Sequence, residues 1–237
     1  MNKRAESCLN YSDLEFVSDF DIRNCKGIGN LFMNTCTRLY LIRHGQVVNY
    51  STGVLNGHND VVLSDLGVKQ MEAAAARLKD EDITAVYCSD LTRSTRGGEL
   101  VAREHGLVPI RSSSLREINF GVWAGLTYAG IQQHYPGALE ERTRRFIDYR
   151  VPEGESIGEM NGRVVPTVKG ILGTHQGRHI ALVAHGGVNR LILADAMNLD
   201  LHNFYSIEQD YGCINIIDYY QDLAVVKLIN GRPSIDF

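Results

Sequence analysis

The stretch LYLIRHG at residues 39–45 decides the fold class of this 237-residue chain. Its first four residues form a short apolar run, which is typical of a strand that is buried on both faces of a parallel sheet. Arg43 and His44 follow at once, and Gly45 lets the backbone approach a ligand closely. In such sheets ligands bind beyond the carboxyl ends of the strands. The stretch therefore predicts a strand that carries a guanidinium and an imidazole to the binding edge of an α/β sheet.

Strand-like and helix-like segments alternate along the rest of the chain. The strand candidates lie at 38–42, 84–88, 108–112, 179–184, 213–219 and 223–229. The helix candidates lie at 64–78, 93–104, 125–135, 156–172 and 188–197. Ser64 and Ser156 occupy N-cap positions, whereas Pro166 predicts a kink or a break, and Gly97 and Gly98 weaken their helix by roughly 1 kcal/mol each. The alternation predicts an α/β three-layer sandwich with a mostly parallel central sheet flanked by helices.

The character of the chain changes near Met33. Residues 1–32 are polar and aperiodic, and a short helix over 11–20 is left open. From residue 37 onward the alternation of strands and helices begins. We therefore expect an N-terminal extension over 1–32 and one α/β domain over 33–237.

Composition argues against several classes of protein. The net charge of −4 and the pI near 6.1 disfavour a nucleic-acid binder, which usually has a basic excess. No apolar run approaches the roughly 18–20 residues that span a bilayer, and the N-terminus lacks the apolar region of a secretory signal. The five cysteines are widely spaced without a CxxC pair, which predicts neither a zinc nor a redox centre. These features predict a cytoplasmic protein with no metal or other cofactor, no nucleic-acid partner and no membrane contact, and they leave a homodimer open.

Further segments are predicted to deliver polar side chains to the same sheet edge. His185 directly follows the strand candidate that ends at Ala184. His44 likewise comes after its own strand candidate, with Arg43 between them. Arg93 and Glu117 each come shortly after another strand candidate. Because the carboxyl ends of parallel strands meet at one edge, we expect these side chains to gather there. Two imidazoles, two guanidiniums and a carboxyl group are suited to phosphoryl transfer.

Each of these groups has a role in such a reaction. Arg43 and Arg93 would hold the phosphate and stabilise the charge on its oxygens. A neutral His44 would attack phosphorus in line to form a phosphohistidine, while His185 would orient the phosphate. Glu117 would donate a proton to the leaving alcohol and then accept one from the water that hydrolyses the intermediate. No metal is needed, because cationic side chains supply the charge.

Four motifs occur in order along the chain: LIRHGQ (41–46), SDLTRS (89–94), LREINFGVWAGLTY (115–128) and LVAHGGVNR (182–190). Together with GHNDVVLSDLG and PEGESIGE, they resemble the histidine phosphatase superfamily, also called phosphoglycerate mutase-like. The resemblance implies that His44 is phosphorylated, that Glu117 is the proton donor, and that the phosphate pocket consists of Arg43, Arg93 and His185. Four further residues are placed on the substrate side of this pocket: Gln46, Asn49, Asn56 and Gly186.

The stretch INFGVWAGLTY, followed by YP and PEGES, resembles the phosphatase branch of this family, which includes α-ribazole phosphatases of cobalamin synthesis. The resemblance implies a small phosphorylated metabolite as substrate, with α-ribazole 5'-phosphate as the leading candidate. Mutases of the family carry a longer basic insertion, whereas only 67 residues (118–184) separate the carboxyl group from the second histidine, which favours hydrolysis. A phosphoglycerate mutase, a fructose-2,6-bisphosphatase and, from another class, a non-catalytic phosphate-binding module remain alternatives. Within this stretch the roles of Arg142, Arg144 and Arg145 are left open.

Ordinary surface ion pairs are the competing interpretation of two of these positions. Arg93 lies close in sequence to Asp90, and Glu117 has Arg116 and Arg111 nearby. An ion pair of either kind would hold the side chain on the surface and away from a ligand.

Overall fold

The computed structural model describes residues 36–233, so the predicted extension over 1–32, with the open helix over 11–20, lies outside the described residues. Within the described part, six strands form a single sheet in the order β3-β2-β4-β1-β5-β6. Their bounds are β1 (Thr37–Arg43), β2 (Ile83–Ser89), β3 (Ile110–Ser112), β4 (His179–Ala184), β5 (Ile214–Tyr219) and β6 (Ala224–Gly231).

Strand pairing sets up the functional edge of this sheet. β4 pairs in parallel with β1 and β2, and β2 pairs in parallel with β3, whereas β5 is antiparallel to both of its neighbours. The predicted mostly parallel sheet is therefore confirmed. In the register of the two central strands, Arg43 lies opposite Ala184. The next residues, His44 and His185, therefore leave the sheet side by side.

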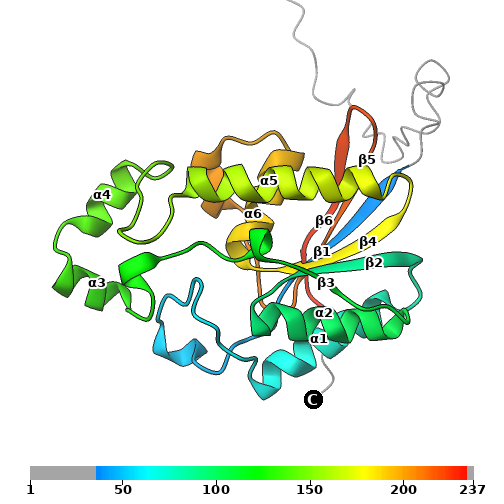
Figure 1. The fold of residues 1–237 in the computed structure, drawn as a ribbon, viewed down its shortest axis with the longest axis horizontal. Helices are drawn as coiled ribbons and strands as arrows, with labels where there is room; N and C mark the ends of the chain where they lie inside the picture. The colour runs from blue at the N-terminus through cyan, green and yellow to red at the C-terminus, as the bar shows by residue number, and fades with distance from the viewer. Residues whose placement is uncertain (1–35, 234–237) are drawn as a thin grey trace, which may run out of the picture. The chain divides into compact units, whose positions relative to one another are not determined.

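Helices cover both faces of the sheet (Figure 1). Side chains of β1 alternate between the two layers: Leu39 and Leu41 pack in the core beneath α5 and α6, whereas Tyr40 and Ile42 pack against α1 and α2. All four are fully buried, as the apolar run predicts, and the three-layer architecture is confirmed. The bounds of the helices are α1 (Asp65–Leu78), α2 (Thr92–Glu104), α3 (Tyr128–His134), α4 (Ala138–Arg144), α5 (Ile157–Thr174) and α6 (Gly186–Ala196).

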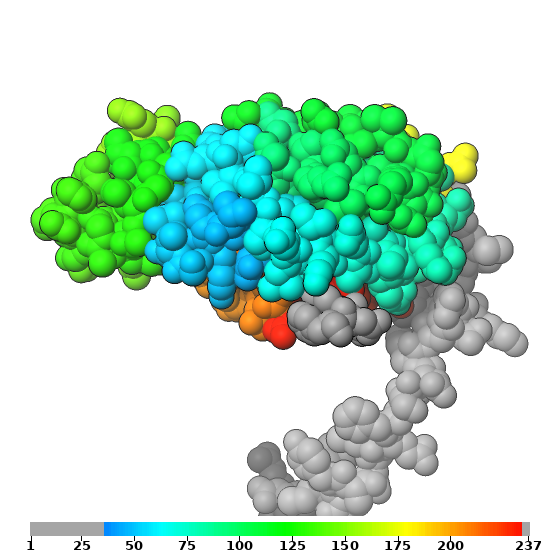
Figure 2. Space-filling model, turned by 90° about the horizontal axis from the view of Figure 1, so that it is seen from below, coloured from blue at the N-terminus to red at the C-terminus, as the bar shows by residue number. Residues whose placement is uncertain are grey.

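The short helices α3 and α4 lie beyond the edge where the central strands end (Figure 1). They have a small core of their own, built on Trp123, Ile131 and Val151. The segment that follows β1 lies between this region and the α1–α2 layer, as Figure 2 shows from below. Loops that converge on the carboxyl edge of the sheet are thus contributed by segments far apart in sequence.

Helix ends follow the capping residues. Ser64 caps α1 by accepting a hydrogen bond from the Gly67 amide, and Ser156 forms a capping box with Glu159. Pro166, where a kink or a break is expected, does not break the helix. α5 is continuous from Ile157 to Thr174. Its buried face, which includes residues on both sides of the proline, packs against the sheet and holds the helix together.

Three predicted starts were wrong by two or three residues. The helix expected from 125 begins at Tyr128, because Gly125 adopts a positive φ of 85° and Thr127 supplies the N-cap. α6 begins at Gly186 instead of 188, with His185 as the N-cap residue. β3 is three residues long and starts at Ile110.

The paired glycines of α2 are explained by close packing. A methyl group on Gly97 would lie 3.0 Å from Val183 Cγ1 of β4, and one on Gly98 would lie 3.0 Å from Cys88 Cβ of β2. The helix therefore approaches the sheet more closely than any larger residue would allow. Tertiary packing offsets the weak helix propensity, so α2 extends from Thr92 to Glu104.

Candidate active site

Two buried histidines form the centre of the site. The centroids of the His44 and His185 rings are 5.1 Å apart, with an angle of 67° between the ring planes. His44 is 5% exposed and His185 is fully buried. Both leave the sheet at the ends of neighbouring parallel strands, so the predicted meeting of the two imidazoles is present in the structure.

The surroundings of the histidines favour their neutral forms. Burial, followed by the positive charges of Arg93 and Arg43, holds the pKa of His44 well below its usual value. Burial, Arg93, His44 and Arg43 lower the pKa of His185 in the same direction. Neither ring nitrogen of His185 has a hydrogen-bond partner among residues 36–233. An unpartnered imidazole in such a place is suited to receive an anion.

The hydrogen bond of His44 assigns its tautomer. Nδ1 lies 2.7 Å from the backbone oxygen of Gly45. A carbonyl oxygen can only accept a hydrogen bond, so Nδ1 carries the proton and donates it. The lone pair of the neutral ring is therefore on Nε2.

Arg93 enters the site from the first turn of α2. Its Nη1 donates to Asn59 O at 2.8 Å and its Nη2 to Gly57 O at 2.6 Å. Asp60 caps the same helix by accepting from the Thr92 amide at 2.7 Å. Burial lowers the pKa of Arg93, although a guanidinium stays charged at any ordinary pH. The alternative ion pair of Arg93 with Asp90 does not form. Two backbone carbonyl groups hold the buried guanidinium instead, and Asp90 pairs with Arg116.

Arg43 is fixed by two residues that sequence reasoning missed. Its Nη1 donates to Gln209 O at 2.6 Å, and its Cζ lies 3.8 Å from the centroid of the Tyr211 ring. Its buried Nε has no hydrogen-bond partner in the described part of the chain. The Tyr211 ring is also 5.6 Å from that of His44. No local pattern marks the loop before β5, because it reaches the site only through the antiparallel pairing of β5 with β1.

Glu117 reaches the site from the segment after β3. Its Oε1 accepts from the Ile118 amide at 2.9 Å, and its Oε2 accepts from the Gly187 amide at 3.0 Å. Neither of the arginines considered as ion-pair partners binds it. Arg116 pairs with Asp90, and Arg111 pairs with Glu99.

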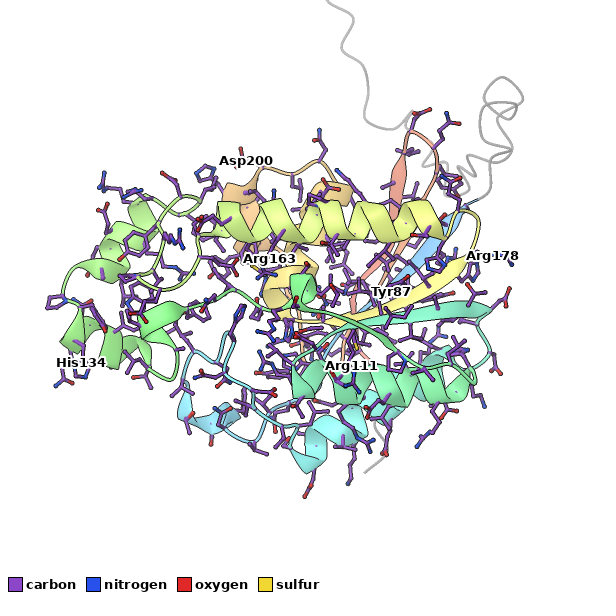
Figure 3. All side chains as sticks on the ribbon, viewed as in Figure 1. Tyr87, Arg111, His134, Arg163, Arg178 and Asp200 are labelled. Carbon is purple, nitrogen blue, oxygen red and sulfur yellow. The ribbon has the colours of Figure 1, made fainter. Side chains whose placement is uncertain are left out.

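Arg163 supports the segment that carries Glu117. From α5 it donates to the backbone oxygens of Ser114, Arg116 and Glu117 at 2.8–3.0 Å and pairs with the carboxylate of Glu155. Figure 3 labels Arg163 below α5, on the side that faces this segment. Sequence reasoning missed this residue because its partners are carbonyl groups about 50 positions away, which no side-chain pattern reveals.

The N-terminus of α6 adds a backbone donor and a further guanidinium. His185 is the N-cap residue, so the Gly186 amide begins the helix and suits an anion, whereas the Gly187 amide donates to Glu117. A methyl group on Gly186 would lie 3.2 Å from Arg190 Nη1 and 3.4 Å from Arg43 Nε. Arg190 therefore borders the same pocket, although the sequence analysis did not single it out.

The remaining predicted substrate contacts make hydrogen bonds with protein groups. Asn49 Nδ2 donates to Asn56 Oδ1 at 2.8 Å, and Asn56 returns a bond at 3.1 Å. Ser64 Oγ lies 3.1 Å from Gln46 Oε1. Gln46, Asn49 and Asn56 lie on the loop after β1, and Ser64 is the N-cap of α1. These bonds therefore order the loop and the start of the helix that follows it.

Two further observations concern the described residues alone. No three His, Cys, Asp or Glu side chains among them are grouped so that they could hold a metal ion. No helix in residues 36–233 is both long and apolar enough to cross a membrane.

Fold and site together define an enzyme of the histidine-based phosphatase class. The model of the histidine phosphatase superfamily (branch 1) matches residues 39–232, and the chain belongs to this family. A Yersinia pestis (strain Pestoides F) protein named "Probable phosphoglycerate mutase GpmB" is 25% identical over 184 residues, which cover 78% of this chain and 86% of that protein. The solved α-ribazole phosphatase from Shigella flexneri is 26% identical, with a TM-score of 0.77 over 82% of this chain and 96% of its own. A mycobacterial glucosyl-3-phosphoglycerate phosphatase is 26% identical, with a TM-score of 0.74 over 83% and 99%.

Proposed function

We propose that this chain is a metal-independent phosphomonoesterase that hydrolyses a small phosphorylated metabolite through a phosphohistidine on His44. One observation carries the proposal. The bond from Nδ1 to Gly45 O at 2.7 Å leaves a bare lone pair on Nε2 of a buried imidazole. The ring lies beside that of His185 and feels the positive charges of Arg93 and Arg43, an arrangement that binds an oxyanion and lets the ring attack it.

The reaction would proceed in two steps, transfer of the phosphoryl group to His44 and its hydrolysis. In the first, Nε2 of His44 forms a bond to phosphorus, the bond to the ester oxygen breaks, and Glu117 gives its proton to the departing alcohol. In the second, water attacks phosphorus, Glu117 takes a proton from that water, and the P–N bond breaks to release inorganic phosphate. Arg43, Arg93 and His185 would hold the phosphoryl oxygens throughout, so that the guanidiniums supply the positive charge.

A variant of the nucleophile tests this mechanism. The wild type is expected to release phosphate from para-nitrophenyl phosphate with a chelator present, and acid-sensitive, base-stable phosphate should be trapped on the protein by rapid quenching. His44→Ala should lower kcat by roughly 10³-fold or more and abolish the trapped phosphate. Equal turnover by His44→Ala and wild type would overturn the proposal. Loss of wild-type activity in the chelator would overturn metal independence alone.

The leaving alcohol is the open part of the assignment. α-Ribazole 5'-phosphate is the first substrate candidate, supported by the likeness to the Shigella flexneri enzyme. Its leaving alcohol is an uncharged nucleoside, whereas the substrate named for the mycobacterial neighbour is a phosphoglycerate derivative with a carboxylate. Turnover across a panel that contains α-ribazole 5'-phosphate, fructose 2,6-bisphosphate and phosphorylated sugars and acids separates these candidates.

A phosphoglycerate mutase is the second candidate, because of the likeness to the Yersinia pestis protein. Mutase activity would interconvert 2- and 3-phosphoglycerate without net release of phosphate. Hydrolysis without interconversion would reject it, and phosphate binding without turnover of any monoester would favour the non-catalytic module.

A further inference from the structure

Three neighbouring arginines in the α4 region differ in their surroundings. Arg144 pairs with Glu141 at 2.6 Å, and Arg145 lies 3.7 Å from the same carboxylate. Both are exposed and have their charges balanced. Arg142 is half-buried, and no carboxylate in the described residues lies within ion-pair distance of it. Of the three, Arg142 is therefore the one whose positive charge is left for a ligand.

Arg142 faces a hollow beside α4. The volume of this hollow is about 300 Å³, and its walls come from α3, α4 and the 3₁₀ helix η6 (Leu201–Ser206). Its lining residues are Tyr128, Leu139, Arg142, Thr143 and Tyr205. Tyr128 and Tyr205 are 54% and 59% exposed, so both side chains are largely open to solvent. The hollow thus offers a cation and polar aromatic walls.

Arg142 also packs against Phe120, which lies on the Arg93 side of the phosphate pocket. The Cζ of Arg142 lies 5.7 Å from the centroid of the Phe120 ring. A methyl group on Gly57 would lie 2.9 Å from Phe120 Cδ2, and the backbone oxygen of Gly57 is one of the two that hold Arg93. A single aromatic ring therefore separates the Arg142 guanidinium from the loop that fixes the catalytic guanidinium.

Tyr205, which lines the hollow, contacts Arg190 on the α6 side of the same pocket. The Cζ of Arg190 lies 5.7 Å from the centroid of the Tyr205 ring, and its Nε donates to Ile207 O at 2.8 Å. The same guanidinium borders Gly186 at the start of α6. Two contacts, one through Phe120 and one through Tyr205, thus place the hollow next to residues that border the phosphate pocket.

We propose that this hollow is a second anion subsite, in which Arg142 pairs with a carboxylate or a further phosphate on the alcohol part of the substrate. The inference rests on the proposed function, because it concerns the leaving group of that reaction. It places phosphate monoesters of acidic alcohols ahead of those whose alcohol is uncharged. A charge-assisted bond to a partly desolvated guanidinium corresponds to about 10- to 100-fold in kcat/KM.

Matched substrate pairs that differ by one anionic group test the proposal. The pairs are 3-phosphoglycerate with glycerol 3-phosphate, 6-phosphogluconate with sorbitol 6-phosphate, and glucose 1,6-bisphosphate with glucose 6-phosphate. The wild type should prefer the more acidic member of at least one pair by about tenfold or more in kcat/KM. The first two pairs report a carboxylate and the third a phosphate, and pairs of two lengths allow for the reach of the subsite.

Two variants of α4 complete the experiment. Arg142→Gln should bring the ratio within the preferred pair close to one, and Arg142→Lys should restore part of it. Arg144→Gln, the matched control on the exposed side of the helix, should leave the ratio unchanged. The inference is overturned if the wild type shows no preference in any pair, if Arg142→Gln keeps the preference, or if Arg144→Gln loses it equally. Hydrolysis of para-nitrophenyl phosphate without any preference would sink this inference and leave the proposed function standing, whereas no hydrolysis at all would sink both.

Discussion

Glu117 and Gly187 are joined by a hydrogen bond from the glycine amide to Oε2 of the carboxylate, with the two atoms 3.0 Å apart. The contact requires a residue without a side chain, because a methyl group on Gly187 would lie within overlapping distance of Glu117 Oε1. It connects the segment after β3 with the first turn of α6, next to His185. The position of the proposed proton donor is therefore set by a glycine on another strand-to-helix turn.

Gly187→Ala is expected to displace Glu117 and to lower turnover of substrates with poor leaving groups. Alkyl phosphates such as glycerol 3-phosphate need the proton donor, so their kcat should fall by roughly 10²-fold. Para-nitrophenyl phosphate, whose leaving group needs little protonation, should lose much less. Steady-state kinetics on the two substrates measures the difference. Gly173→Ala, at a position in α5 where an added methyl group meets nothing within 4 Å, is the control. An equal loss on both substrates would show that Gly187 acts on something other than Glu117.

The stability of the protein should fall as the pH drops below about 6.5. The pKa values of His44 and His185 in the folded protein lie well below the ordinary 6.5, so the unfolded chain takes up protons that the native state does not. Below the unfolded value each histidine therefore lowers the free energy of unfolding by up to about 1.4 kcal/mol per pH unit, until its native pKa is reached. Urea denaturation between pH 7.5 and 5.5 measures this slope. His185→Gln should show a shallower slope than the wild type, and identical slopes would contradict the burial of a neutral histidine.

Two glycine-to-alanine changes in helices should have opposite effects on stability. In α2, Gly98→Ala places a methyl group 3.0 Å from Cys88 Cβ and should destabilise by about 1–3 kcal/mol through overpacking. In α5, an added methyl group at Gly162 meets nothing within 4 Å, and Gly162→Ala should stabilise by about 0.5–1 kcal/mol through helix propensity. Denaturant midpoints of the two variants check the prediction. A gain in stability for Gly98→Ala would mean that α2 does not pack closely on the sheet.

Tyr211→Leu should weaken the binding of inorganic phosphate. The ring of Tyr211 lies against the guanidinium of Arg43 and holds it toward the site. Loss of a partly desolvated cation–π contact, about 1–2 kcal/mol, corresponds to roughly 5- to 30-fold in the inhibition constant of phosphate. Competitive inhibition by phosphate measures the change. Tyr219→Phe, which alters a tyrosine packed against the α5–α6 side of the core, should leave the inhibition constant as it is.

Much of the fold was predictable from local pattern. The run Leu39–Ile42 identified a doubly buried strand, and Ser64 and Ser156 marked helix starts, because period and capping depend on neighbouring residues only. The start of α3 at Tyr128 was not predicted, because the positive φ of Gly125 and the N-cap at Thr127 delay the helix. At Gly97 propensity cast doubt on a helix that close packing on the sheet sustains.

The candidate site was predictable to the extent that strand ends define it. Five residues come together because each lies at or soon after the carboxyl end of a strand at the same edge of the sheet: Arg43, His44, Arg93, Glu117 and His185. Arg163, Arg190, Gln209 and Tyr211 were missed, since they reach the site from helices and loops that no strand-end rule covers. Besides the pair of Arg163 with Glu155, their contacts are mainly with backbone atoms, ring faces and a guanidinium, which leave no mark in the spacing of residues.

The sequence by itself determined the class of this protein: a parallel α/β sheet whose strand ends carry two histidines and two arginines, because burial period and strand-end position are local properties. The tertiary structure alone decided the chemical state of those groups. Which nitrogen of His44 bears its proton, which amide holds Glu117, and that Arg142 has its charge unmatched all depend on distances and desolvation among residues far apart in the chain.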